Sequence, residues 1–204
     1  MAEKPILFST EMVRAILGGR KTQTRRVIKP QPLNVVDDDK ALAYAMSGSS
    51  PLVGRFLSEV IKDATYAVGD ILLVWETWAR RECEGLLREG RCYPVSCDCR
   101  YAYRADYDTT ALFKWRPSTH MPRAAARIFL RVTDVRAERL GDISGDDVLA
   151  EGVENGKSNP TMGVRWQNMQ RMAFAELWDS INAKHGYGWD ANPWCWVYEF
   201  ERIK

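Results

Sequence analysis

The sequence predicts an α+β protein, because segments with strand patterns and segments with helix patterns both occur along the chain. Residues Ile71–Trp75 form a continuous apolar run behind a Gly-Asp turn, which indicates a buried strand. Residues Trp194–Ile203 alternate and place large aromatic side chains on one face, which indicates a second strand. Residues Trp166–Asn182 show the longest helical periodicity.

Composition places the chain among soluble globular proteins of one domain spanning residues 1–204. A chain of 204 residues with 46% hydrophobic and 27% charged residues has enough apolar material for a sizeable core. The net charge is only +2, so contact with nucleic acid requires a local basic patch. The sequence has no signal-peptide pattern and no membrane-length apolar run, so we expect a cytoplasmic protein without a membrane partner. The oligomeric state stays open.

The other elements can be predicted from local signals. Ser9 or Thr10 can cap a short helix that Gly18-Gly19 ends, since a hydroxyl satisfies free backbone N–H groups and glycine accepts the left-handed conformation. Ser144 and Asp147 have capping-box spacing at the start of a second short helix. Strand patterns occur at residues 5–8, 101–105 and 128–136, and insertions near residues 33–65 and 80–100 are expected to be loops around short elements.

The long helix carries an apolar stripe that we interpret as core rather than as a cofactor site. The residues at helical spacing are Met169, Met172, Ala173, Phe174, Leu177 and Ile181.

The stretch Arg20–Arg26 is the first candidate functional segment. It places four cations and two threonines in seven residues, directly after the glycine pair that ends the first helix. Lys21 at the mouth of a short strand and Thr24 three residues later can converge on one small carbonyl-bearing or anionic ligand. A solvated basic loop is the simpler interpretation of the same residues.

A second candidate segment is Lys114–Arg123, where two prolines exclude a long helix or a central strand. Its cations and its tryptophan have the composition of a site for a base and a phosphate or ribose. We expect this segment to lie beside Lys21. Glu76 and Trp78 follow the buried strand, and Glu76 is either a carboxylate at the strand edge or a group that orients Lys21 or an arginine.

Four cysteines, Cys83, Cys92, Cys97 and Cys99, fall close together and raise the question of a structural zinc site. Their spacing argues against it, because no Cys-x-x-Cys pair occurs and Cys97-Asp98-Cys99 is too tight for the usual pair. We therefore predict no metal and no cofactor, with unliganded thiols in a loop.

Three motifs together resemble the ASCH domain, a relative of the PUA-like RNA-binding fold, and in particular the longer ASCH proteins of phages and prophages. They are Ile16–Thr24, Lys114–Arg123 and Asn192–Val197. The resemblance covers most of the chain except roughly residues 33–65 and 80–100. It implies a PUA-like β-barrel with flanking helices.

The resemblance also implies an activity. Small bacterial ASCH proteins are N4-acetylcytidine amidohydrolases, and their proposed lysine, threonine and glutamate match Lys21, Thr24 and Glu151 here. The implied partner is a modified nucleoside or RNA, and the implied substrate-binding residues are Arg20, Arg25, Arg26, Glu76, Trp78, Lys114, Trp115, Arg116, Ser118, His120 and Arg123. Arg25 replaces the apolar residue typical of the small enzymes, which leaves the substrate open. The alternative is an RNA or modified-nucleotide binding module without catalysis.

Overall fold

The structure, a computed structural model, describes residues 2–32, 35–36, 55–80, 87–88, 91–92, 101–108, 113–153 and 163–203. These residues form an α+β protein, which confirms the predicted class. They group into two compact units, each of which is described below by itself. Residues 1–19, 71–131 and 202–204 make up unit 1, and residues 20–70 and 132–201 make up unit 2.

Unit 1 contains the N-terminal strand and the buried strand that the apolar run predicted. Strand β1 (Glu3–Leu7) pairs in parallel with β5 (Ile71–Trp75). Strand β5 pairs antiparallel with the first residues of β10 (Phe129–Arg139). Helix α1 begins at the cap Ser9, whose side chain accepts from the backbone N–H of Met12. The bounds are β1 (Glu3–Leu7), α1 (Thr10–Leu17), β5 (Ile71–Trp75), β6 (Trp78–Arg80), β7 (Leu87–Arg88), β8 (Arg91–Cys92), β9 (Tyr101–Tyr103) and three 3-10 turns, Arg104–Asp106, Ser118–His120 and Arg123–Ala125.

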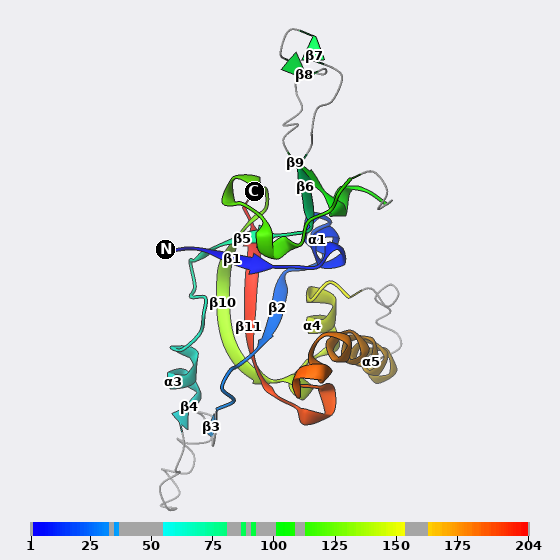
Figure 1. Cartoon of the computed structure of the whole chain (residues 1–204). Coiled ribbons are helices and arrows are strands. Elements are labelled where there is room, and N and C mark those ends of the chain that lie inside the picture. Colours follow the sequence, from blue (N-terminus) through cyan, green and yellow to red (C-terminus); the bar gives the residue numbers. More distant parts are fainter. Residues whose placement is uncertain are drawn as a thin grey trace, which may run out of the picture. The chain divides into compact units, whose positions relative to one another are not determined.

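In unit 2 the remainder of β10 pairs with β11 (Trp194–Arg202), and β11 pairs antiparallel with β2 (Gln23–Val27). Figure 1 shows β10 and β11 as long curved strands beside β2, with α4 and α5 near one another. The bounds are β2 (Gln23–Val27), β3 (Val35–Val36), β4 (Arg55–Phe56), α3 (Leu57–Ile61), β10 (Phe129–Arg139), α4 (Gly145–Ala150), α5 (Gly163–Asn182), β11 (Trp194–Arg202) and three 3-10 turns, Leu140–Asp142, Ala183–His185 and Trp189–Ala191.

Five strands therefore hydrogen-bond in the order β1-β5-β10-β11-β2. β10 contributes residues to both units, and β11 does so through its last residue, Arg202. Two hydrophobic clusters of described residues contribute to the core of unit 2. Leu140, Ile143 and Val148 pack with Phe174 and Trp178 of α5, and α3 packs against Trp196 and Tyr198 of β11.

The predicted apolar stripe of α5 is partly wrong. Phe174 is buried as expected, but Met169, Met172, Leu177 and Ile181 are exposed by 36–66%, while Gln170 and Trp178 face the core. Apolar residues occur on several sides of this helix, so sequence periodicity alone did not identify the buried side.

Candidate functional site

The start of β2 and the end of α4 meet in unit 2, and this contact builds the candidate site. Gly19 has a φ of +72°, the left-handed conformation that glycine adopts without steric cost, and it lets the chain turn from α1 into β2. Lys21 and Glu151 then form an isolated antiparallel bridge, and the N–H of Thr22 donates to the carbonyl of Ala150 at 2.8 Å. Gly152, also left-handed, ends α4 directly after Glu151.

Lys21 and Glu151 form a buried ion pair. The ammonium of Lys21 donates to Oε2 of Glu151 at 2.8 Å and to its backbone oxygen at 2.9 Å. The two side chains are 0% and 5% exposed. Burial lowers the pKa of Lys21, and the charges of Arg26 and Arg25 lower it further, while the Glu151 carboxylate acts in the opposite direction. Burial and the Glu151 carboxylate thus act on the pKa of this lysine in opposite directions, and burial is the larger effect.

Arg25 is bound to the same carboxylate from the other side. Its Nη1 lies 3.4 Å from Oε1 of Glu151, and its Nη2 lies 2.9 Å from Oε2 of Glu138 and 3.5 Å from Oδ2 of Asp147. The Arg25 side chain is fully buried, so this ring of acids neutralises a charge that would be costly alone. Arg25, which the sequence predicts to bind substrate, therefore contacts three carboxylates of the protein itself.

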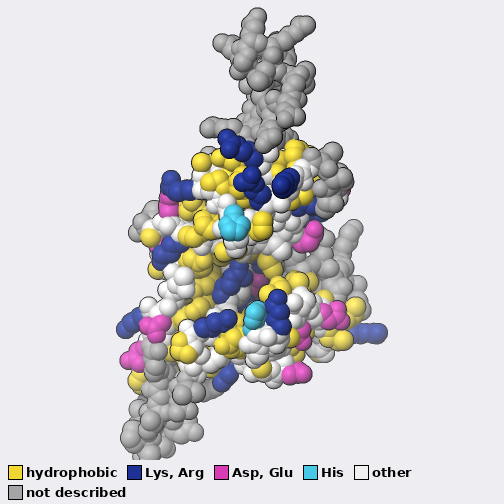
Figure 2. Space-filling view, viewed as in Figure 1, with side chains coloured by type: hydrophobic (Ala, Val, Ile, Leu, Met, Phe, Trp, Pro, Cys, Tyr) yellow, Lys and Arg dark blue, Asp and Glu magenta, His cyan; other side chains and the backbone are white. Residues whose placement is uncertain are grey.

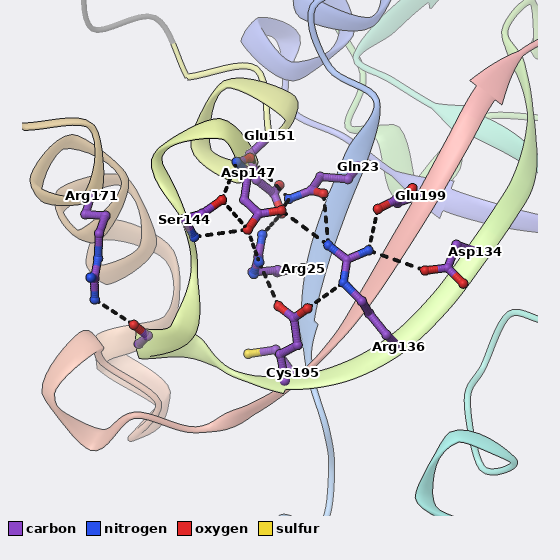
Figure 3. A network of polar contacts seen from close by, with 12 residues as sticks. Gln23, Arg25, Asp134, Arg136, Ser144, Asp147, Glu151, Arg171, Cys195 and Glu199 are labelled. Carbon is purple, nitrogen blue, oxygen red and sulfur yellow. Dashed lines mark hydrogen bonds and ion pairs between the residues drawn. The ribbon is translucent and has the colours of Figure 1, made fainter. Parts of the chain in front are cut away.

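Polar contacts extend outward from Arg25, as Figure 3 shows. The amide nitrogen of Gln23 donates to both the backbone oxygen and Oδ1 of Asp147 at 3.1 Å. Arg136 of β10 contacts Glu138, Asp147 and Glu199. Asp147 also completes the predicted capping box with Ser144. Burial tends to raise the pKa of Asp147, but hydrogen bonds from Ser144 and the charge of Arg25 hold that pKa below its ordinary value.

Sequence reasoning did not identify Glu138 or Arg136 as members of this site. Both lie on β10. Glu138 is 113 positions from its partner Arg25 on β2, and Arg136 is 113 positions from its partner Gln23 on the same strand. Nothing in their local pattern distinguishes them from other charged residues on a half-exposed strand. Their role becomes visible only once β10, β11 and β2 are adjacent.

Thr24 and Arg26 lie on the other face of β2. In the register with β11, Thr24 is opposite Tyr198 and Arg26 is opposite Trp196, so these four side chains share a face. Thr24 is 1% exposed, and its Oγ1 accepts from Nη1 of Arg26 at 3.0 Å. Burial lowers the pKa of Arg26, and the charge of Glu151 opposes that shift. Arg20, in the turn before β2, is exposed.

The remaining residues predicted to bind substrate belong to unit 1. Glu76 is buried and accepts from Arg127 at 2.9 and 3.2 Å, so the arginine it orients is Arg127. Arg127 also pairs with Asp106 at 2.7 Å and lies 3.9 Å from the centre of the Tyr103 ring. Burial raises the pKa of Glu76, although Arg127 acts against this change.

The segment Lys114–Arg123 also lies in unit 1, whereas Lys21 lies in unit 2. Trp78 is buried with Met121 and Ala125, so its ring serves in packing. The guanidinium of Arg116 lies 5.3 Å from the centre of that ring. Trp115 is half-buried against Phe113 and Tyr107.

The polar residues of this segment lie towards its surface. Lys114 and His120 are exposed, and Ser118 is half-buried in the same 3-10 turn as His120. Arg123 is exposed and forms an ion pair with Glu3.

Two further features concern metals and membranes. The cysteine cluster falls outside the described residues, apart from the backbone of Cys92. Among the described residues, no group of three or more His, Cys, Asp or Glu side chains could hold a metal ion. No helix in the described part of the chain has both the length and the apolar character needed to cross a membrane.

Comparison with known proteins gives two similar solved structures. One is a protein of the DUF984 family from Enterococcus faecalis V583, with 10% identity, a TM-score of 0.42 and coverage of 100% of this chain and 76% of that chain. The other is an ASCH domain from Lactobacillus crispatus JV V101, with 12% identity, a TM-score of 0.39 and coverage of 99% and 80%. No family model matches the sequence, and no curated protein matches it either.

Proposed function

We propose that this protein is an amidohydrolase that acts on an N4-acylated cytidine or a related modified nucleoside. The observation that carries the proposal is the buried pair of Lys21 and Glu151, whose atoms approach to 2.8 Å although the residues are 130 positions apart in sequence. Thr24, on β2 three residues after Lys21, is a buried hydroxyl that accepts a hydrogen bond from Arg26. A nucleophile, a base and a group that orients the base are the parts that acyl transfer needs.

In the first step, Oγ of Thr24 attacks the acyl carbon. We infer that the hydroxyl proton passes to the amine of Lys21 once substrate is bound, since without substrate Thr24 bonds to Arg26 and Lys21 bonds to Glu151. A lysine at its ordinary pKa of 10.5 is protonated at neutral pH and cannot accept this proton. Burial lowers the pKa of Lys21, which favours the neutral amine that the step requires. Glu151 holds the lysine in place through two hydrogen bonds.

In the second step, the bond between the acyl carbon and N4 breaks, and N4 takes the proton back from Lys21. Cytidine leaves with its amine restored, and the acyl group remains on Thr24 as an ester. Water then attacks the ester carbon and Lys21 takes one water proton. The bond between the acyl carbon and Oγ of Thr24 breaks, Lys21 returns that proton to Oγ, and the carboxylic acid departs. Arg26, already bonded to Thr24, supplies positive charge for the oxyanion of both tetrahedral intermediates.

The test is release of cytidine from N4-acetylcytidine by the pure protein, followed by liquid chromatography. We expect Lys21→Ala, Thr24→Ala and Glu151→Ala each to lower the rate at least about a hundredfold, since each removes a group used in proton transfer or attack. Thr24→Ser is the matched control, because it keeps the hydroxyl and should retain activity. Turnover that survives all three alanine substitutions contradicts the mechanism.

A second candidate function, binding of RNA without catalysis, is favoured by the composition of unit 1. Arg104 lies 5.9 Å from the centre of the Trp115 ring, and Lys114 and Arg116 are exposed nearby in sequence. Figure 2 shows basic and hydrophobic side chains interspersed over the face it presents. Cations among aromatic rings suit unpaired bases and their phosphates.

A further inference from the structure

Unit 2 contains a cavity of about 620 Å³ on the Thr24 and Arg26 face of β2. This volume lies in the usual range of small-molecule sites, roughly 300–1,000 Å³. Ile28, Val60, Trp196 and Tyr198 line it and are almost fully buried, so they form an apolar floor. Arg26 lines the same cavity.

Arg26 connects the cavity to the candidate nucleophile. Its side chain lines the cavity while its Nη1 donates to Oγ1 of Thr24 at 3.0 Å. Tyr198, directly opposite Thr24 in the strand register, lines the cavity as well. A ligand in the cavity that bonds to Arg26 is therefore held by the same guanidinium that holds the threonine hydroxyl.

One wall comes from the chain segment that follows α3. Asp63, Thr65 and Tyr66 line the cavity there, and Asp63 and Thr65 belong to the stretch that the resemblance to ASCH proteins does not cover. The ring of Tyr66 packs edge-on against Tyr198, with 5.0 Å between centroids and 71° between planes. Tyr66 is only half-buried, which suits a ring that stacks on a planar ligand.

A second wall is the segment from Ile28 to Pro32, and hydrogen bonds join it to β11. The amide nitrogen of Gln31 donates to the backbone oxygens of Ile28 and Trp194 at 2.7 and 3.1 Å, and its oxygen accepts from the N–H of Trp194 at 2.7 Å. The N–H of Ile28 donates to the same Trp194 oxygen at 3.0 Å. A wall held by four hydrogen bonds presents a preformed site, which reduces the entropy cost of binding.

We propose that this cavity is the compartment that receives the acylated base, with Tyr66 stacking on the pyrimidine ring and Arg26 donating to the amide carbonyl oxygen. This inference rests on the proposed amidohydrolase function and adds the location and the contacts of the substrate. A planar ring bearing an exocyclic amide matches the apolar floor, the half-exposed tyrosine and the cation at the end beside Thr24.

The charge at Arg26 supports this orientation. Burial lowers the pKa of Arg26, which means that its surroundings stabilise the cation less well than water does. A carbonyl oxygen placed against the guanidinium adds an acceptor to those it already has, which include Oγ1 of Thr24 and the backbone oxygen of Arg25. The developing negative charge of a tetrahedral intermediate is a stronger acceptor, so the interaction strengthens as the reaction proceeds.

The experiment measures binding and turnover separately on the full chain. Isothermal titration calorimetry with cytidine and with N4-acetylcytidine reports binding, and cytidine release reports kcat and KM. We expect Tyr66→Leu to weaken binding and to raise KM about tenfold with little change in kcat, since it removes a stacking surface, while the matched Tyr66→Phe keeps it. Thr65→Trp, at an exposed residue of the wall, should obstruct the cavity, and Thr65→Ser is its control.

The outcomes separate this inference from the proposed function. Wild-type binding of cytidine that Thr65→Trp and Tyr66→Leu weaken, with or without turnover, supports the cavity as the nucleoside site. Turnover with a KM that neither substitution changes leaves the amidohydrolase intact and overturns the inference. A wild-type protein that binds neither nucleoside overturns it as well.

Discussion

At the scale of single residues, Glu151 is the centre of the candidate site. Each of its carboxylate oxygens faces a different cation, Oε2 with Lys21 and Oε1 with Arg25. Its backbone oxygen accepts from Lys21 too, so the lysine is held at two points of one residue. This arrangement makes the position of the Lys21 amine depend on where α4 ends.

The lowered pKa of Lys21 predicts a pH dependence of stability. Between the lowered pKa in the folded state and the ordinary value of 10.5, the unfolded chain binds more protons at this residue than the folded chain does. The contribution of Lys21 to the free energy of unfolding should therefore rise with pH in that window. Urea denaturation of the wild type and of Lys21→Met from pH 8 to 10 measures it, because the difference between the two isolates this residue.

We expect the stability of the wild type to increase relative to Lys21→Met as the pH rises. A difference that is constant across the window, or that falls, would show that the folded state does not lower this pKa. The raised pKa values of Tyr66 and Tyr198 act on both proteins equally and cancel in the difference.

Prediction from sequence succeeded for individual residues where the signal was local. Ser9, Gly19 and the Ser144–Asp147 capping box occupy the expected positions because caps and turns depend on their nearest neighbours. Glu138 was missed because its contact with Arg25 depends on which strands become adjacent, and no local pattern records that.

At the scale of elements, α4 is short but is fixed at both ends. The capping box closes its first turn, and the N–H of Thr22 donates to the carbonyl of Ala150 in its last turn. Asp147 serves the cap and the network at once, since it also contacts Arg25, Arg136 and Gln23. A helix of six residues would be marginal alone, so these contacts hold it in place.

Asp147→Ala should therefore cost more stability than the loss of a helix cap, which is typically about 1 kcal/mol. It also removes an acceptor from the buried Arg25, and we expect a total of roughly 2–4 kcal/mol in urea denaturation. If the protein hydrolyses N4-acetylcytidine as proposed, the rate should fall as well, because Glu151 caps the C-terminal end of α4. Asp146→Ala is the matched control, since Asp146 is an exposed neighbour in the same turn. Equal effects of the two substitutions would contradict the dual role.

The elements themselves were mostly predictable, but the buried side of α5 was not. The β10 strand was expected at residues 128–136 and extends over Phe129–Arg139. Residues 166–182 are helical as expected, yet Met172 is 66% exposed while Trp178 is 5% exposed. Which side of a helix is buried depends on its neighbour, here α4 with Val148 and the turn at Leu140.

At the scale of the whole molecule, the predicted site residues divide between two units. Unit 2 holds the lysine, threonine and glutamate together with the cavity, and unit 1 holds the exposed cations of residues 114–123. The sequence predicts that both groups bind the same substrate, because both are basic. Their membership of separate units calls for tests that treat them independently.

Substitution of the unit 1 cations tests the RNA-binding alternative. For the variant Lys114→Gln/Arg116→Gln, we expect weaker binding of a single-stranded RNA. We also expect the logarithm of the binding constant to depend less on the logarithm of the salt concentration. This slope should fall by about one for each phosphate that is no longer neutralised. Fluorescence anisotropy across a salt series measures both. Lys184→Gln, at an exposed lysine of unit 2, is the control for a general loss of charge. An unchanged slope in the double variant would exclude these residues from any phosphate interaction.

The alternation along β2 limits how the length of this chain can vary. Gln23 and Arg25 face the acids beside α4, whereas Thr24 and Arg26 lie on the opposite face of the strand, where Arg26 lines the cavity. One residue inserted between Lys21 and Gln23 would rotate every later side chain of the strand to the opposite side, so that Arg25 would enter the cavity and Thr24 would meet the carboxylates. Homologous sequences that keep this site should therefore vary across residues 21–26 by substitution and not by insertion or deletion. Insertions and deletions should be tolerated in the segments outside β2.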